Sequence, residues 1–261
     1  MPYVILLLGT LFILTSCGKP DAPQRETTYG NPPAQGFRAD ESDPRAVALA
    51  DSVMQALGGR KAWDNTRYLG WNFFGMRQLV WDRVGKRVRI HSFPDSTVYL
   101  LDDLEEVSGQ VFRNGRPVRA PHLLDSLLRQ GKSIWINDSY WLVMPFKLKD
   151  SGVALRYLGR DTMPGGTTAE LIALEFEDVG DTPQNKYHVY IHPETHRVGA
   201  WSYFRQAADS VPALTTPWKD YRSYGGILLS GDRGQRQLTD IRVWDSLPDS
   251  VFTRLHAWNG Y

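Results

Sequence analysis

The chain has 261 residues, of which 42% are hydrophobic and 23% charged, and its formal net charge is +1. A chain of this size can bury one large core or two small ones, and its near-neutral charge gives no support for binding nucleic acid or strongly acidic partners. Cys17 is the single cysteine, so neither a disulfide within the chain nor a cysteine-rich metal site is expected.

The first segment is short, apolar and ends at that cysteine. An apolar run over residues 4–14 leads into Leu14-Thr15-Ser16-Cys17. Such a run is typical of a cleavable signal peptide and is too short to span a membrane. The tetrapeptide resembles the bacterial lipobox, whose cysteine is acylated, for example by palmitate, and becomes the first mature residue. We therefore expect residues 1–16 to be a lipoprotein signal peptide and Cys17 to carry the lipid; an ordinary signal peptide is the alternative.

Residues 17–42 follow as the lipidated cysteine and a polar segment rich in proline and glycine. This composition is typical of a flexible tether. Gly18 stands directly after the cysteine, where an aspartate is associated in lipoproteins with retention at the inner membrane. We therefore expect a lipid anchor in the outer membrane and a domain over residues 43–261 that faces the periplasm.

The first expected helix lies between Asp43 and Gly58-Gly59. Asp43 can cap it, Pro44 suits its first turn, and the glycines can end it. The apolar residues between them recur at helical spacing and indicate one buried face. They are Ala46, Val47, Ala50, Val53, Met54 and Leu57.

From Thr66 onward the apolar residues alternate with polar ones, which predicts short antiparallel strands separated by turns. The clearest runs are 68–73, 87–91, 172–177 and 187–192. The predicted fold is mainly β (α+β): a single large curved antiparallel sheet, or incomplete β-barrel, covered on one side by helices.

One helix is expected to interrupt the strands, over residues 121–132. Asn137-Asp138-Ser139 breaks its pattern. The aromatic segment from Tyr140 to Leu148 then contains Pro145, which disfavours a central strand there. We expect this segment to be either a rim over a cavity or a packed strand edge.

Three segments together resemble the lipoprotein-carrier superfamily, the LolA/LolB-like proteins of Gram-negative envelopes. They are Leu57-Gly58-Gly59 with Ala62-Trp63, the stretch 138–148, and the hairpin 190–195. The resemblance, to an anchored relative of that superfamily, implies an incomplete antiparallel barrel closed by helices, with an apolar cavity that accepts acyl chains.

A curved sheet would bring its inward side chains together, either as a filled core or as the lining of a cavity. The candidate ligand-binding residues are Trp71, Phe73, Trp81, Val88, Ile90, Tyr140, Trp141, Ile172, Leu174 and Phe176.

The histidines and acidic residues do not form a recognisable metal site. His188 and His192 share a strand face but stand about 13 Å apart at 3.3 Å per residue. His192 and His196 flank a turn and could face each other as a surface pair. The acidic cluster 102–106 lacks the spacing of a calcium loop and fits a hairpin turn. No metal ion and no cofactor are expected.

No nucleophile motif, phosphate-binding loop or dinucleotide fingerprint is present in the sequence. We therefore expect a non-catalytic, membrane-anchored periplasmic lipoprotein that binds a lipid or acylated protein in a half-barrel. Two alternatives remain open. One is an interaction module of an envelope assembly with a filled core, and the other is a hydrolase.

Overall fold

The computed structural model describes residues 30–177 and 179–258, and the chain from Asn31 onward forms one compact unit. Cys17 and residues 1–29 lie outside the described residues, so the signal peptide and the lipid anchor remain predictions. None of the helices in the described ranges combines the length and apolar content needed to cross a membrane.

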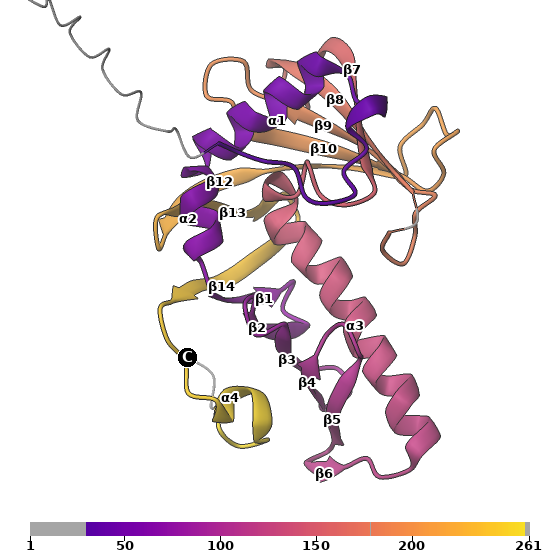
Figure 1. Ribbon diagram of the computed structural model, residues 1–261, viewed down its shortest axis with the longest axis vertical. Helices are drawn as coiled ribbons and strands as arrows, with labels where there is room; N and C mark the ends of the chain where they lie inside the picture. The colour runs from indigo at the N-terminus through magenta and orange to yellow at the C-terminus, as the bar shows by residue number, and fades with distance from the viewer. Residues whose placement is uncertain (1–29, 178, 259–261) are drawn as a thin grey trace, which may run out of the picture. The chain divides into compact units, whose positions relative to one another are not determined.

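Fourteen strands in the described residues form two antiparallel sheets (Figure 1). The larger has nine strands in the order β12-β13-β14-β1-β2-β3-β4-β5-β6, and the smaller has five in the order β11-β10-β9-β8-β7. The mainly antiparallel β class predicted from the sequence is confirmed, and neither strand order closes on itself. The sequence predicted one sheet where the structure has two.

The strand bounds of the larger sheet are β1 Tyr68–Phe73, β2 Arg77–Asp82, β3 Arg87–Ser92, β4 Thr97–Asp103, β5 Ser108–Arg113, β6 Arg116–Pro117, β12 Lys219–Tyr224, β13 Ile227–Arg233 and β14 Arg236–Trp244. Those of the smaller sheet are β7 Val153–Thr162, β8 Thr168–Phe176, β9 Lys186–Ile191, β10 Val198–Phe204 and β11 Leu214–Pro217. The helices are α1 Pro44–Ala56, α2 Gly59–Asn65, α3 Pro121–Val143 and α4 Ser250–Thr253, with short 3₁₀ turns η1 Ala39–Glu41 and η2 Met144–Phe146.

Helix α1 ends where the sequence predicts, and the reason is a close approach. Gly58 has φ of +112°, and a Cβ atom on it would lie 2.4 Å from the carbonyl oxygen of Gly226 in the β12–β13 turn. The backbone N–H of Leu228 donates to the Leu57 carbonyl at 2.9 Å. Glycine is therefore required at position 58 both by its left-handed conformation and by the neighbouring hairpin.

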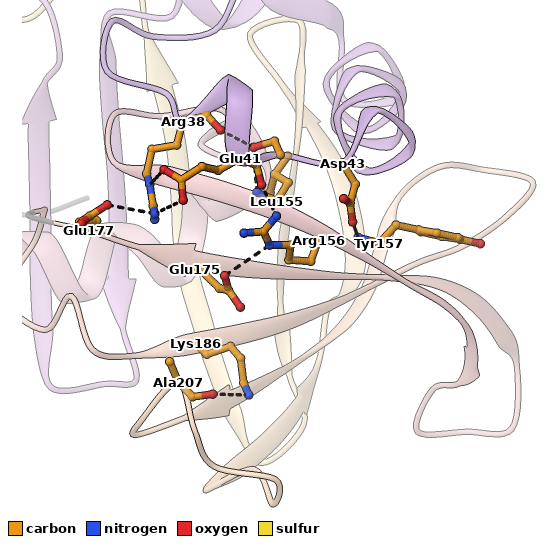
Figure 2. Close-up of polar contacts among 11 residues, drawn as sticks. Arg38, Glu41, Asp43, Leu155, Arg156, Tyr157, Glu175, Glu177, Lys186 and Ala207 are labelled. Carbon is orange, nitrogen blue, oxygen red and sulfur yellow. Dashed lines mark hydrogen bonds and ion pairs between the residues drawn. The ribbon is translucent and has the colours of Figure 1, made fainter.

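Residues 38–43 lie along β7 (Figure 2). The N–H of Arg38 donates to the Val153 carbonyl at 3.0 Å, and the Asp43 carboxylate accepts the N–H of Tyr157 at 2.8 Å. The Asp43 side chain makes no capping bond to α1. Residues 38–42, which the sequence analysis assigned to the tether, are therefore packed on the smaller sheet, because they supply hydrogen-bond partners to the backbone of its edge strand.

Helix α3 packs on the larger sheet and is longer than predicted. It contacts β3, β4 and β5, and its C-terminal part reaches β13 (Figure 1). At Gly131 a Cβ atom would lie 2.9 Å from side-chain atoms of both Tyr99 and Leu101, so the helix approaches β4 closely at this point. Helix α4 covers the opposite sheet face, where Val251 and Phe252 pack on Tyr68 and Val80.

The expected break at Asn137-Asp138-Ser139 is wrong, because Asp138 has a distant partner. Its side chain is fully buried, and Arg77 of β2 donates to its two carboxylate oxygens at 2.7 and 3.0 Å. Burial raises the pKa of the Asp138 carboxyl, and the hydrogen bonds from Arg77 act in the opposite direction. A paired carboxylate can face the sheet, so α3 continues to Val143. Tyr140 and Trp141 therefore lie on a helix, not on a strand edge.

We expect Asp138→Ala to lower the free energy of unfolding by about 3 kcal/mol, because it removes a fully buried carboxylate and leaves the half-buried Arg77 guanidinium without its partner. Asp125→Ala on the same helix breaks the exposed pair with Arg129 and should lower it by less than about 1 kcal/mol. Urea unfolding measures both values. Equal effects at the two positions would contradict the structural role given to the Arg77–Asp138 pair.

Candidate functional site

A cavity of about 620 Å³ lies between the C-terminal half of α3 and the smaller sheet. Its volume falls within the range of about 300–1,000 Å³ that is usual for small-molecule sites. Eight of its lining residues are aromatic: Trp81, Trp135, Tyr140, Trp141, Phe176, Tyr187, Trp201 and Tyr203. An apolar molecule or an apolar chain could be buried against these rings.

Helix α3 lines the cavity with a second face, beside the one that packs on the larger sheet. One face carries Leu124, Leu128, Gly131, Trp135, Asp138 and Leu142 at alternating spacings of four and three, the pattern of a buried seam. The second face carries Ser133, Ile136, Asn137, Tyr140 and Trp141, all of which line the cavity. A helix that only covered the sheet would need the first face alone.

The smaller sheet supplies the facing wall through its strand register. Tyr187 of β9 pairs with Leu174 of β8 on one side and with Tyr203 of β10 on the other. Residues directly opposite in an antiparallel pair point to the same face, and so do residues two apart in a strand. Phe176, Tyr187, Trp201 and Tyr203 therefore share the face that looks toward α3.

The aromatic rings of helix and sheet contact one another at the wall of the cavity. The Tyr187 and Trp201 rings are stacked with centroids 4.9 Å apart. Tyr140 lies 5.5 Å from Tyr187, and Trp141 lies 5.1 Å from Trp201 in an edge-on arrangement. These separations are those of favourable aromatic pairs, so the wall is preorganised in the absence of a ligand.

The C-terminus of α3 is held by Arg233 of β13. One terminal nitrogen of its guanidinium donates to the Trp141 carbonyl at 2.7 Å, and the other donates to Ser230 Oγ at 2.8 Å. The guanidinium also stacks 3.6 Å from the Trp218 ring centroid. Burial lowers the pKa of Arg233 to about 9. A cation favours the carbonyl end of a helix, so Arg233 fixes the position of Trp141.

Few charged groups line the cavity among the described residues. Lys147 and Asp150 form an ion pair with each other, and Asp181 is exposed. Histidine is absent from the described lining residues.

Three hydrogen-bond donors on the lining aromatic residues are buried without an acceptor among the described residues. They are the indole nitrogens of Trp135 and Trp201 and the hydroxyl of Tyr140. Buried donors in folded proteins almost always have a partner. These donor atoms have almost no accessible surface, even toward the cavity, so a ligand could reach them only if neighbouring side chains moved.

Four of the residues proposed from the sequence line the cavity: Trp81, Tyr140, Trp141 and Phe176. The other six belong to the buried core and are at most 3% exposed: Trp71, Phe73, Val88, Ile90, Ile172 and Leu174. They point inward as predicted, but the packing of α3 and the two sheets leaves no space beside them. Trp201 and Tyr203 stand two apart in one strand, and Tyr187 stands in the strand before it. From this pattern the aromatic wall of the smaller sheet could have been predicted.

Histidine and carboxylate side chains form no group of three that could hold a metal ion in the described part of the chain. The His192 Nδ1 atom accepts the backbone N–H groups of Glu194 and Thr195, both at 3.3 Å, within its own turn. Asp103 likewise accepts the N–H groups of Glu105 and Glu106 at 2.7 and 3.0 Å, as in a hairpin turn.

We expect the burial of Tyr140 and Tyr187 to contribute a loss of stability as the pH rises from about 10 to about 12, which the difference between the unchanged protein and Tyr187→Phe isolates. Burial raises the pKa of Tyr187 to about 12 and that of Tyr140 well above its usual value of 10. Unfolded tyrosines would then ionise while the folded ones stay neutral, so protons are released on unfolding. Urea unfolding from about pH 9 to about pH 11 measures this loss. Tyr187→Phe should make it shallower, and an unchanged slope would contradict the assignment.

No family model matches the chain, and no curated protein matches it. Solved structures do resemble it. A DUF1329 family protein from Desulfovibrio piger is 12% identical, with a TM-score of 0.43, over 82% of this chain and 98% of the other. A domain assigned to the outer membrane lipoprotein-sorting proteins, from Vibrio parahaemolyticus, is 13% identical, with a TM-score of 0.38, over 80% of this chain and 96% of the other.

The structure of MucB is 15% identical over 62% of this chain and 53% of the other, with a TM-score of 0.23.

Proposed function

We propose that this chain is a membrane-anchored envelope lipoprotein that binds an amphiphile with an acyl chain, such as a lipid or an acylated protein, without transforming it. The observation that carries the proposal is the cavity of about 620 Å³ beneath the second face of α3. Burial of an acyl chain there would favour binding by about 0.8 kcal/mol per methylene group.

The chemistry of the lining supports binding in preference to catalysis. Rings and aliphatic groups predominate, and the polar groups are hydroxyls, amides, one ion pair and the exposed Asp181 carboxylate. General acid–base catalysis most often relies on histidine, which the described lining residues lack. The interaction module with a filled core is less well supported, because an open cavity of this size is present.

The proposed location follows from the sequence. Cys17 in its lipobox-like setting would carry the acyl anchor, and Gly18 after it favours the outer membrane with the domain facing the periplasm. The compact unit begins at Asn31, so residues 18–30 are the part of the chain proposed to act as the tether.

Binding can be tested with the full-length chain and three ligands that share a twelve-carbon chain: glycerol monododecanoate, dodecylphosphocholine and dodecanoate. We expect at least one to bind stoichiometrically by isothermal titration calorimetry. A ligand at about 100 times its Kd should also stabilise the fold by about 2.7 kcal/mol in thermal unfolding. If none of the three binds, the proposal is wrong.

A blocking variant locates the binding site. Ser133→Trp places a large ring on the cavity face of α3 and should weaken binding by about tenfold or more, because it occupies the space of the acyl chain. Gln130→Trp adds the same ring to an exposed position of the same helix outside the cavity and should leave the affinity unchanged. Equal effects of the two variants would place the ligand elsewhere.

A further inference from the structure

The geometry of the lining points to a ligand class: we propose that the cavity selects amphiphiles with an uncharged, oxygen-bearing head group, such as an acylglycerol ester, over the fatty-acid anion of the same chain. This inference rests on the proposed function and adds to it the chemistry of the head group.

The charge of the lining disfavours an anion. Lys147 is the one cationic side chain among the described lining residues, and its ammonium group is already paired with the Asp150 carboxylate. Asp181 adds a further negative charge. An incoming carboxylate would therefore lose its hydration without gaining a free cation, and moving an unpaired carboxylate out of water is costly.

The ion pair is held in place by its loop. Lys147 and Asp150 are three residues apart, and the Asp150 N–H donates to the Lys147 carbonyl at 3.2 Å. The N–H of Ala34 donates to the Lys149 carbonyl at 2.9 Å, so the preceding segment holds the same loop. Lys147 thus has its carboxylate partner at hand whether or not a ligand is present.

The hydrogen-bonding groups favour a neutral oxygen. Apart from the ion pair and Asp181, the polar side chains of the lining are neutral hydroxyls and amides, and those of Ser133, Asn137 and Ser151 are exposed. An ester carbonyl or a glycerol hydroxyl carries no net charge, so it could accept a hydrogen bond from such a group without the cost of a buried ion.

The experiment compares glycerol monododecanoate with dodecanoate at about pH 8, where a carboxyl group is ionised. With the full-length chain we expect the glyceride to bind about tenfold or more tightly than the anion, measured by isothermal titration calorimetry. Equal or stronger binding of dodecanoate overturns the inference and leaves the proposed function standing. Failure of both ligands and of dodecylphosphocholine removes the proposed function itself.

Two variants that remove the same charge test the role of the ion pair. Asp150→Asn frees Lys147 and should raise the ratio of the dodecanoate affinity to the glyceride affinity about tenfold. Asp181→Asn leaves Lys147 paired and should raise the affinity for dodecanoate by no more than about twofold. If both variants have the same effect, or if Asp150→Asn has none, pairing of Lys147 does not control selection and that mechanism is wrong.

Discussion

Buried guanidinium groups that bind the carbonyl ends of helices hold this fold together. Arg83 donates to the carbonyls of Trp63 and Thr66 at the end of α2. Arg89 donates to one carbonyl within α4, that of Val251, and to two that follow it. Arg233 donates to the carbonyl of Trp141 near the end of α3. Burial lowers the pKa of each, to about 10 for Arg83 and Arg89 and about 9 for Arg233. Arginine suits this role because its five donors can satisfy several carbonyls at once and it keeps its charge at neutral pH. Each of these arginines lies in, or directly after, a strand of the larger sheet, so the sheet sets where three of the helices end.

The position of α3 matters most, because that helix belongs both to the core and to the candidate site. Its first face is buried on the larger sheet, where Gly131 permits contact with Tyr99 and Leu101. Its second face is left for the smaller sheet, and the two apolar surfaces meet only in part. The cavity is thus the space that remains because α3 packs closely on the larger sheet and contacts the smaller sheet only in part.

Local pattern was enough to predict some elements, and distant pairing decided the others. Helix α1 was predictable from its cap residues and its single apolar face, and the strands from their alternation. The second half of α3 could not be predicted in this way. Asp138 suggests a helix break unless its partner Arg77, 61 residues away, is known. That β12–β14 belong to the larger sheet depends on the pairing of β14 with β1, which lie far apart in the sequence. For the same reason Trp81 and Phe176 line the cavity while Trp71 and Leu174 are core: all four point inward, and only the tertiary packing separates them.

The cavity stays open because its helical wall is fixed at two nearby points. Asp138 is bound to β2 through Arg77, and the carbonyl of Trp141 is bound to β13 through Arg233. Less than one helical turn separates these anchors, so the segment that carries Tyr140 and Trp141 can neither tilt toward the smaller sheet nor rotate about the helix axis without breaking a buried, charged hydrogen bond. An apolar space would otherwise tend to collapse, because closing it recovers dispersion contacts. Two charged anchors on the core side of α3 oppose that tendency. They connect the stability of the fold to the presence of a binding site, although neither arginine is among the residues that line it.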